Sequence, residues 1–203
     1  MHTPYLLRTG LMAAVLLSFS LPAELLAQQM PEILRIRRLE ADTVRAPQYT
    51  TRGGPAAQQR QRQWLEIKTE FQTSRDGPEW FNELTFTYYV AMRNNNPAEG
   101  DRPLNVFSGE SKYINVAQNQ RGQSAVYLHP STLDRYGEFF RAAVVISFQG
   151  RMIAVEHTPS AAAADGRWWE QVSPQPGLVL PRRHTPFAMI NFDDFEATPL
   201  PER

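Results

Sequence analysis

The residues that could do acid–base or metal chemistry are few and widely spaced. Past the N-terminal segment the chain holds three histidines, His129, His157 and His184, and no two have the spacing of a metal site. The HEXXH zinc pattern and the GxSxG nucleophile pattern are both missing. Ser131 lies near His129, but Pro130 and Ser131 are better explained as the entry and cap of a short helix. A hydrolase is therefore the weakest of the functions considered.

An acidic cluster lies near the C-terminus, where residues 192–196 read FDDFE. A hard cation such as Ca²⁺ needs about six or more oxygen ligands, drawn from several loops. The spacing and glycine of an EF-hand are missing, so we interpret the cluster as a solvated patch. The chain has no cysteine, which excludes disulfides, thiolate metal sites and a cysteine nucleophile. We expect neither catalytic residues nor a metal or other cofactor.

Two adjacent tryptophans, Trp168 and Trp169, could bind a ligand by stacking on a sugar ring. Adjacent residues on a strand point to opposite faces, so at most one of the two could face a ligand. Packing in the core or at an interface is the commoner role of such residues. The pair nevertheless supports one alternative function, that of a carbohydrate-binding, lectin-like module of the cell envelope.

The elements that position these residues are short strands with alternating apolar side chains. Helical periodicity is almost absent, and polar loops containing Gly and Pro separate the strands. This pattern is typical of an all-β protein, and we expect an immunoglobulin-like antiparallel sandwich of 7–9 strands, with a barrel as the main alternative. The expected strands are 32–39, 64–73, 84–93, 104–106, 112–116, 124–128, 139–148 and 151–157.

The strand at residues 84–93 has two faces of different character. One face is apolar and should lie in the core: Leu84, Phe86, Tyr88, Val90 and Met92. The other is neither clearly polar nor clearly apolar: Thr85, Thr87, Tyr89 and Ala91. This second face is either an ordinary outer sheet surface or a surface covered by a partner subunit. We take it as a candidate interface.

A second feature favours the immunoglobulin-like topology. Asp134 and Tyr136 stand just before the apolar strand 139–148. They resemble the tyrosine corner that precedes the penultimate strand of such sandwiches, where the tyrosine hydroxyl bonds back across the corner. The match is partial, because the cysteine pair and core tryptophan of antibody domains are absent.

The N-terminus predicts export. Residues 1–27 contain Arg8, an apolar run from Leu11 to Leu21 and Ala27 before Gln28, which is the pattern of a secretory signal peptide. An uncleaved anchor is the alternative. We then expect an N-terminal strand and a Pro/Gly/Gln/Arg-rich linker in 28–63, a sandwich in 64–197 and a tail in 198–203. The protein should reside in the periplasm, at the outer membrane or outside the cell.

Charge argues against nucleic-acid binding, because 21 basic residues balance 21 acidic ones. The segments WLEIKTEFQT, ELTFTYYVAMR and YLHPSTLDRYG together resemble a family of secreted verrucomicrobial proteins encoded in type IV pilus gene clusters, of the Akkermansia type. The resemblance covers residues 30–195. It implies an immunoglobulin-like β-sandwich and a role in pilus assembly, and it carries over no catalytic residues.

The function expected from these observations is non-enzymatic. The protein should act by protein–protein interaction in type IV pilus or cell-envelope assembly. Its partners would be further copies of itself, as a homo-oligomer, or pilus and envelope proteins. A glycan ligand belongs to the alternative reading, and no stable membrane span is expected after signal cleavage.

Overall fold

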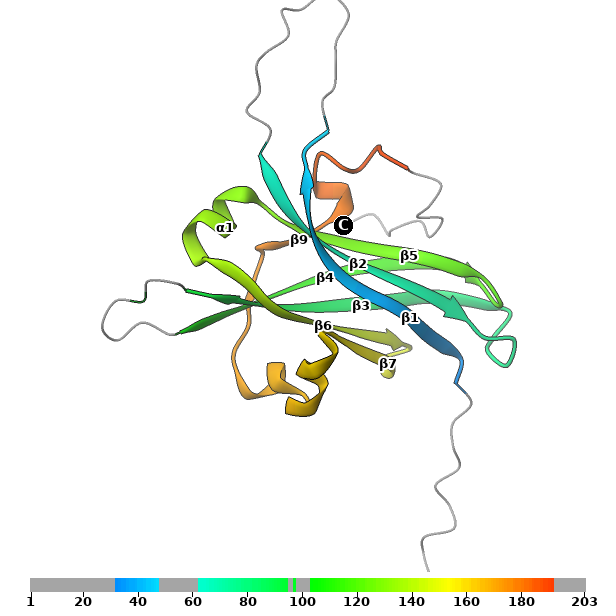
Figure 1. The fold of residues 1–203 in the computed structure, drawn as a ribbon. Coiled ribbons are helices and arrows are strands. Elements are labelled where there is room, and N and C mark those ends of the chain that lie inside the picture. The colour runs from blue at the N-terminus through cyan, green and yellow to red at the C-terminus, as the bar shows by residue number, and fades with distance from the viewer. Residues whose placement is uncertain (1–31, 48–61, 95–96, 98–102, 192–203) are drawn as a thin grey trace, which may run out of the picture. The chain divides into compact units, whose positions relative to one another are not determined.

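The computed structural model describes residues 32–47, 62–94, 97 and 103–191, and strands dominate these ranges (Figure 1). One sheet has the order β1-β2-β5-β9, with bounds Leu34–Arg45, Gln63–Thr73, Arg121–Leu128 and Val179–Pro181. The other has the order β7-β6-β3-β4-β8, with bounds Arg151–Thr158, Glu138–Phe148, Trp80–Arg93, Leu104–Ala117 and Gln175–Pro176. The predicted all-β sandwich is confirmed, with nine strands in the described ranges.

The strand order matches the immunoglobulin scheme. All pairs are antiparallel except the short pair of β4 with β8. In that scheme strands A, B and E share one sheet with D, while C, F and G form the other. Here β1, β2 and β5 take the places of A, B and E, and β3, β6 and β7 take those of C, F and G. The fourth strand pairs with β3, and the short β9 lies beside β5 where D would lie.

The core lies between the sheets and contains the predicted apolar face of β3. Its five members are fully buried, as expected from their alternation: Leu84, Phe86, Tyr88, Val90 and Met92. From the opposite sheet Ile67, Phe71, Val126 and Leu128 pack in the same cluster. Each such side chain contributes about 1.5–3 kcal/mol when fully buried, so this face of β3 stabilises the fold.

Four hydroxyl groups meet inside this apolar core. The Tyr88 hydroxyl on β3 lies 2.9 Å from both Thr69 Oγ1 on β2 and Ser124 Oγ on β5. The Tyr113 hydroxyl on β4 donates to Ser124 Oγ at 3.0 Å. Burial raises the pKa of both tyrosines, so they stay neutral. We call these four residues the hydroxyl cluster, and it joins two strands of each sheet.

Two boundaries differ from those expected. The first strand extends to Arg45 and pairs with β2 as far as Gln63, so it belongs to the sandwich rather than to a separate N-terminal segment. The strand expected in two pieces around Ser108-Gly109 is continuous as β4. Gly109 is there for another reason: a Cβ atom would lie 2.3 Å from the carbonyl oxygen of Val179. Residues 1–31, 48–61 and 192–203, on which the expected signal peptide, most of the expected linker, the acidic cluster and the expected tail fall, lie outside the described ranges.

The only α-helix in the described ranges, α1 (Pro130–Tyr136), links β5 to β6. Its cap is His129, whose Nδ1 accepts a hydrogen bond from the Ser131 backbone N–H at 3.1 Å. The prediction of Ser131 as the cap is therefore wrong, since Pro130 already occupies the first helical position. Asp134 and Tyr136 lie in this connection, and the Tyr136 ring packs edge-on against Phe107 at 4.8 Å. The tyrosine-corner hydrogen bond stays a prediction.

Tyr88→Phe should destabilise the domain, because it removes a buried hydroxyl and the hydrogen bonds that this hydroxyl makes to Thr69 and Ser124. The expected loss is about 1–3 kcal/mol in the free energy of unfolding, measured by chemical denaturation. Adding Thr69→Val to Tyr88→Phe should cost less than the sum of the two single changes, because the valine leaves no orphaned hydroxyl. Strict additivity, or unchanged midpoints, would contradict a coupled cluster.

Candidate functional site

The candidate interface on the outer face of β3 is divided by the chain's own C-terminal segment. Thr85, Thr87 and Tyr89 are half-buried, whereas Ala91 is fully buried. Two 3-10 helices lie over this side of the five-stranded sheet: η2 (Ser160–Asp165) and η3 (Trp168–Gln171), drawn as short coils after β7 in Figure 1. We call residues 160–171 the tryptophan strap.

The strap is held by aromatic packing on the sheet. Trp168 and Trp169 are only 3% and 4% exposed and cluster with Ala91 and Ala143. The Trp169 ring stacks on Tyr89, with centroids 5.3 Å apart and planes at 14°. The small alanine side chains leave room for the indoles to approach the sheet closely. The outer face of β3 is thus covered at this end by its own chain.

Two expectations are therefore wrong in detail. Trp168 and Trp169 lie on a 3-10 helix rather than a strand, so the alternation rule does not apply, and both rings are buried. Neither presents a free ring face for a sugar in this structure. Ala91 is not available to a partner either, because the strap covers it. Thr85, Thr87 and Tyr89 remain the accessible part of the candidate interface.

Polar groups beneath the strap are incompletely satisfied. The Arg141 guanidinium lies 4.4 Å from the Trp168 ring centroid and pairs with Asp165. Three buried atoms have no hydrogen-bond partner in the described ranges: Arg141 Nε, His157 Nδ1 and Trp168 Nε1. An unpaired buried polar group costs about 1–3 kcal/mol. The strap is consequently less firmly held than its apolar contacts alone would suggest.

Beside the strap the outer face opens into a groove of about 520 Å³. Thr87 and Tyr89 of β3 line it together with Ser108 of β4. Its other wall is the segment that carries β8 and β9, with Pro174, Pro176 and Pro181. β8 pairs with β4 at Phe107 and Ser108, which holds this segment in place. We call this hollow the proline groove.

Sequence reasoning did not find the proline groove. Proline is expected to interrupt strand pairing, yet Pro176 pairs with Ser108 in β8 and Pro181 pairs with Val126 in β9. What forms the groove is the passage of their segment across β4, far away in sequence. The close approach at Gly109 is the one local signal that could have pointed to it.

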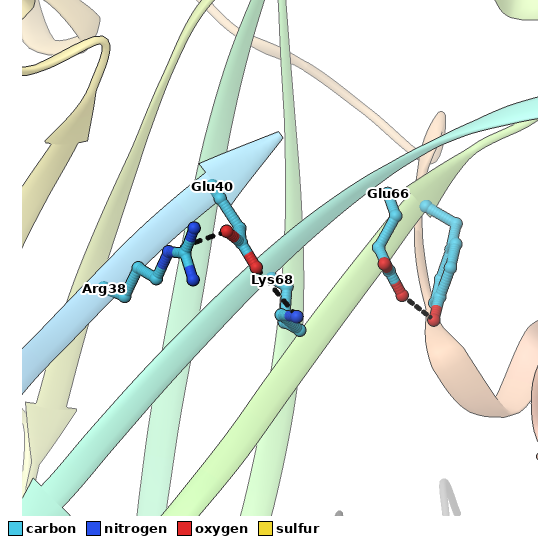
Figure 2. Close-up of polar contacts among 5 residues, drawn as sticks. Arg38, Glu40, Glu66 and Lys68 are labelled. Carbon is cyan, nitrogen blue, oxygen red and sulfur yellow. Dashed lines mark hydrogen bonds and ion pairs between the residues drawn. The ribbon is translucent and has the colours of Figure 1, made fainter. Parts of the chain in front are cut away.

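The outer face of the other sheet carries a charged network, shown in Figure 2. Glu40 of β1 accepts contacts at 2.7 Å from both Arg38 and Lys68. The hydrogen bond to Glu40 is the main cause that raises the pKa of Lys68. The Tyr127 hydroxyl donates to Glu66 at 2.5 Å, and its pKa is raised first by burial and then by Glu66. Glu40–Lys68 and Glu66–Tyr127 join neighbouring strands and Arg38–Glu40 lies within β1, so we assign these contacts to the fold.

Other chemistry finds no support in the described ranges. They contain no group of three or more His, Cys, Asp or Glu side chains that could hold a metal ion. His129 caps α1, His157 lies under the strap and His184 is exposed at the proline groove. The three histidines therefore belong to three different sites. No helix within these ranges has the length and hydropathy of a membrane span.

Removing the Trp169 ring should release the strap. Trp169→Ala deletes the stack on Tyr89, and loss of a buried tryptophan costs about 3–5 kcal/mol where the site cannot collapse. We expect a lower denaturation midpoint and faster trypsin cleavage after Arg167. The control is Val172→Ala, since Val172 is 42% exposed and should change neither quantity. Unchanged cleavage in Trp169→Ala would contradict this account.

The stability of the strap should depend on pH through His157. Burial lowers the pKa of His157 below its ordinary value of 6.5; Arg141 lowers it further, and Glu156 opposes the shift. The charged groups of the strap segment itself are Asp165, Arg167 and Glu170. Because the unfolded chain takes up the proton more readily, stability should be full above about pH 6.5 and fall as pH drops below it. His157→Gln should flatten this acid slope in thermal melts, while the exposed control His184→Gln should keep it. An identical slope in His157→Gln would refute the assignment.

Comparison with known proteins places the chain in a family. A family model matches residues 26–200, which is most of the chain. No curated protein matches. A crystal structure from Akkermansia muciniphila matches with a TM-score of 0.69 and 20% sequence identity, over 84% of this chain and 94% of that one. At this identity the match establishes a shared fold.

A second solved structure, a β-D-glucoside glucohydrolase from Trichoderma reesei, matches at 9% identity and a TM-score of 0.24. It covers 61% of this chain and 18% of that one. This similarity is too low to support any argument about fold or activity.

The match of the family model over residues 26–200 spans the whole sandwich, together with the strap and the proline groove. The chain therefore belongs to the family that this model defines, and it shares its fold with the Akkermansia muciniphila protein.

Proposed function

We propose that this protein is exported and acts without catalysis, by binding another protein during type IV pilus or cell-envelope assembly. The observation that carries the proposal is the proline groove, which the half-buried Thr87 and Tyr89 of the candidate interface line beside a proline-containing wall. The signal-peptide pattern supports export. The fold shared with the Akkermansia muciniphila protein is compatible with the sequence resemblance to pilus-cluster proteins.

The chemistry of the groove suits a protein partner. Tyrosine is enriched in interfaces, and charged residues are depleted at interface centres. Within the groove, Thr87, Tyr89 and Ser108 supply neutral polar and aromatic contacts. Prolines carry no backbone N–H, so the wall offers carbonyl oxygens and rigid apolar rings. Glu110 and His184 also line the groove and could fix the orientation of a partner.

The groove is also preformed. β8 fixes its wall on β4, and β9 fixes the same segment on β5 through Val126, Tyr127 and Leu128. A partner would therefore not need to order this segment when it binds, which lowers the entropic cost of association. The stacked Tyr89 ring is likewise already oriented by Trp169.

A photo-cross-linking residue at position 87, in cells that carry the pilus machinery, should capture a pilus or envelope protein identified by mass spectrometry. Thr87→Lys should weaken that complex at least about tenfold, since it places an unpaired charge in the contact. Thr43, exposed on β1 of the other sheet, gives the matched control Thr43→Lys. Equal cross-linking from positions 43 and 87, or products with cytoplasmic proteins alone, would overturn the proposal.

A further inference from the structure

Trp80 stands apart from the other tryptophans of the chain. The chain has four, and Trp64, Trp168 and Trp169 are 6%, 3% and 4% exposed. Trp80, at the start of β3, is 52% exposed. An indole left half in water presents a large flat apolar face at the surface. It lies at the end of β3 opposite to the one that the strap covers.

A hollow of about 430 Å³ adjoins this ring. The volume falls in the range of about 300–1,000 Å³ usual for small-molecule sites. Trp80 lines it together with Phe71, Val116 and Gly122, and the polar lining residues are amides. None of the lining side chains carries a charge. A ligand matched to this hollow is therefore neutral, with one apolar face and hydrogen-bonding groups at its edge.

Two amides at the hollow are available for such a ligand. Asn115 and Asn119 line it and are exposed, and neither side chain has a hydrogen bond to another residue of the part of the chain that the structure describes. Both have left-handed backbone angles, with φ of 56° and 54°. Asparagine tolerates this conformation better than most residues, and it retains here both a donor and an acceptor.

The hollow is built on a fixed frame. Trp80 pairs with Ala117 across β3 and β4. The Thr73 hydroxyl donates to the Ala117 carbonyl at 2.8 Å, and the Gln118 N–H donates to the Glu79 carbonyl at 2.9 Å. These bonds tie the turn after β2 to the turn after β4. The backbone that carries Trp80 and the two asparagines is thereby held in place without a ligand, which favours binding.

We propose that this hollow binds a neutral saccharide, whose C–H face stacks on Trp80 and whose hydroxyls bond to Asn115 and Asn119. A sugar ring combines an apolar face with a rim of donors and acceptors, which is the combination that the lining offers. The site is separate from the tryptophan strap and from the proline groove. The tryptophan proposed to stack on the sugar is thus Trp80, and not Trp168 or Trp169.

Two-dimensional NMR of the four indole N–H groups in the full chain tests this directly. Cellotetraose and triacetylchitotriose serve as neutral probes at millimolar concentration, with a heparin disaccharide as the anionic comparison. At least one neutral probe should shift the Trp80 signal and leave the three buried indoles unmoved. Trp80→Ala should lower its affinity at least about tenfold, while Trp80→Phe keeps part of it.

Further variants separate the site from the fold and from the proline groove. Asn119→Gly removes the amide while accepting the left-handed backbone, so it should weaken binding without unfolding the chain. Thr87→Lys should leave saccharide binding unchanged. The proposal is overturned if neither neutral probe moves the Trp80 signal, if binding survives Trp80→Ala, or if only the heparin disaccharide binds.

Discussion

Four buried hydroxyl groups hold the two sheets of this molecule in one register. Tyr88 reaches across the core to Thr69 and Ser124, and Tyr113 reaches the same serine. An apolar core alone would tolerate small slides of one sheet on the other, because dispersion contacts are not directional. Hydrogen bonds are directional, and a buried hydroxyl that loses its partner is costly. The outer features rest on this alignment, since the strap and the prolines are placed by strands that the hydroxyl cluster aligns.

The core of the sandwich was predictable because its signal is local. Alternation along β3 identified all five inward side chains, and the same rule located most of the strands. Partners across the core were not predictable, because nothing near Tyr88 in the sequence indicates Thr69 or Ser124. The continuity of β4 was missed for a related reason. A glycine such as Gly109 usually indicates a break in a strand. Here a glycine is required because Val179 approaches the backbone too closely for a side chain to fit.

The candidate sites were harder to predict than the core. Residues 160–171 lack any period, so nothing indicated that Trp168 and Trp169 would fold back together over Ala91 and Ala143. The alternation argument for the tryptophan pair required a strand, and a 3-10 helix replaced it. The predicted strand 84–93 does not include Trp80, because the apolar alternation begins at Leu84, whereas β3 begins at Trp80. The turn after β4, which forms the hollow together with Trp80, is brought beside it only in the folded chain.

The path of the C-terminal segment has a mechanical consequence. It pairs first with β4 of one sheet as β8 and then with β5 of the other as β9, so a single stretch of chain stitches both sheets along one edge. Each stitch involves only two or three residue pairs. Tension applied beyond residue 191 would first load the packing of Phe187 on Tyr127 and would then peel β9 pair by pair, before it reached the long strands. This edge would act as a weak link that yields under load while the seven long strands stay paired.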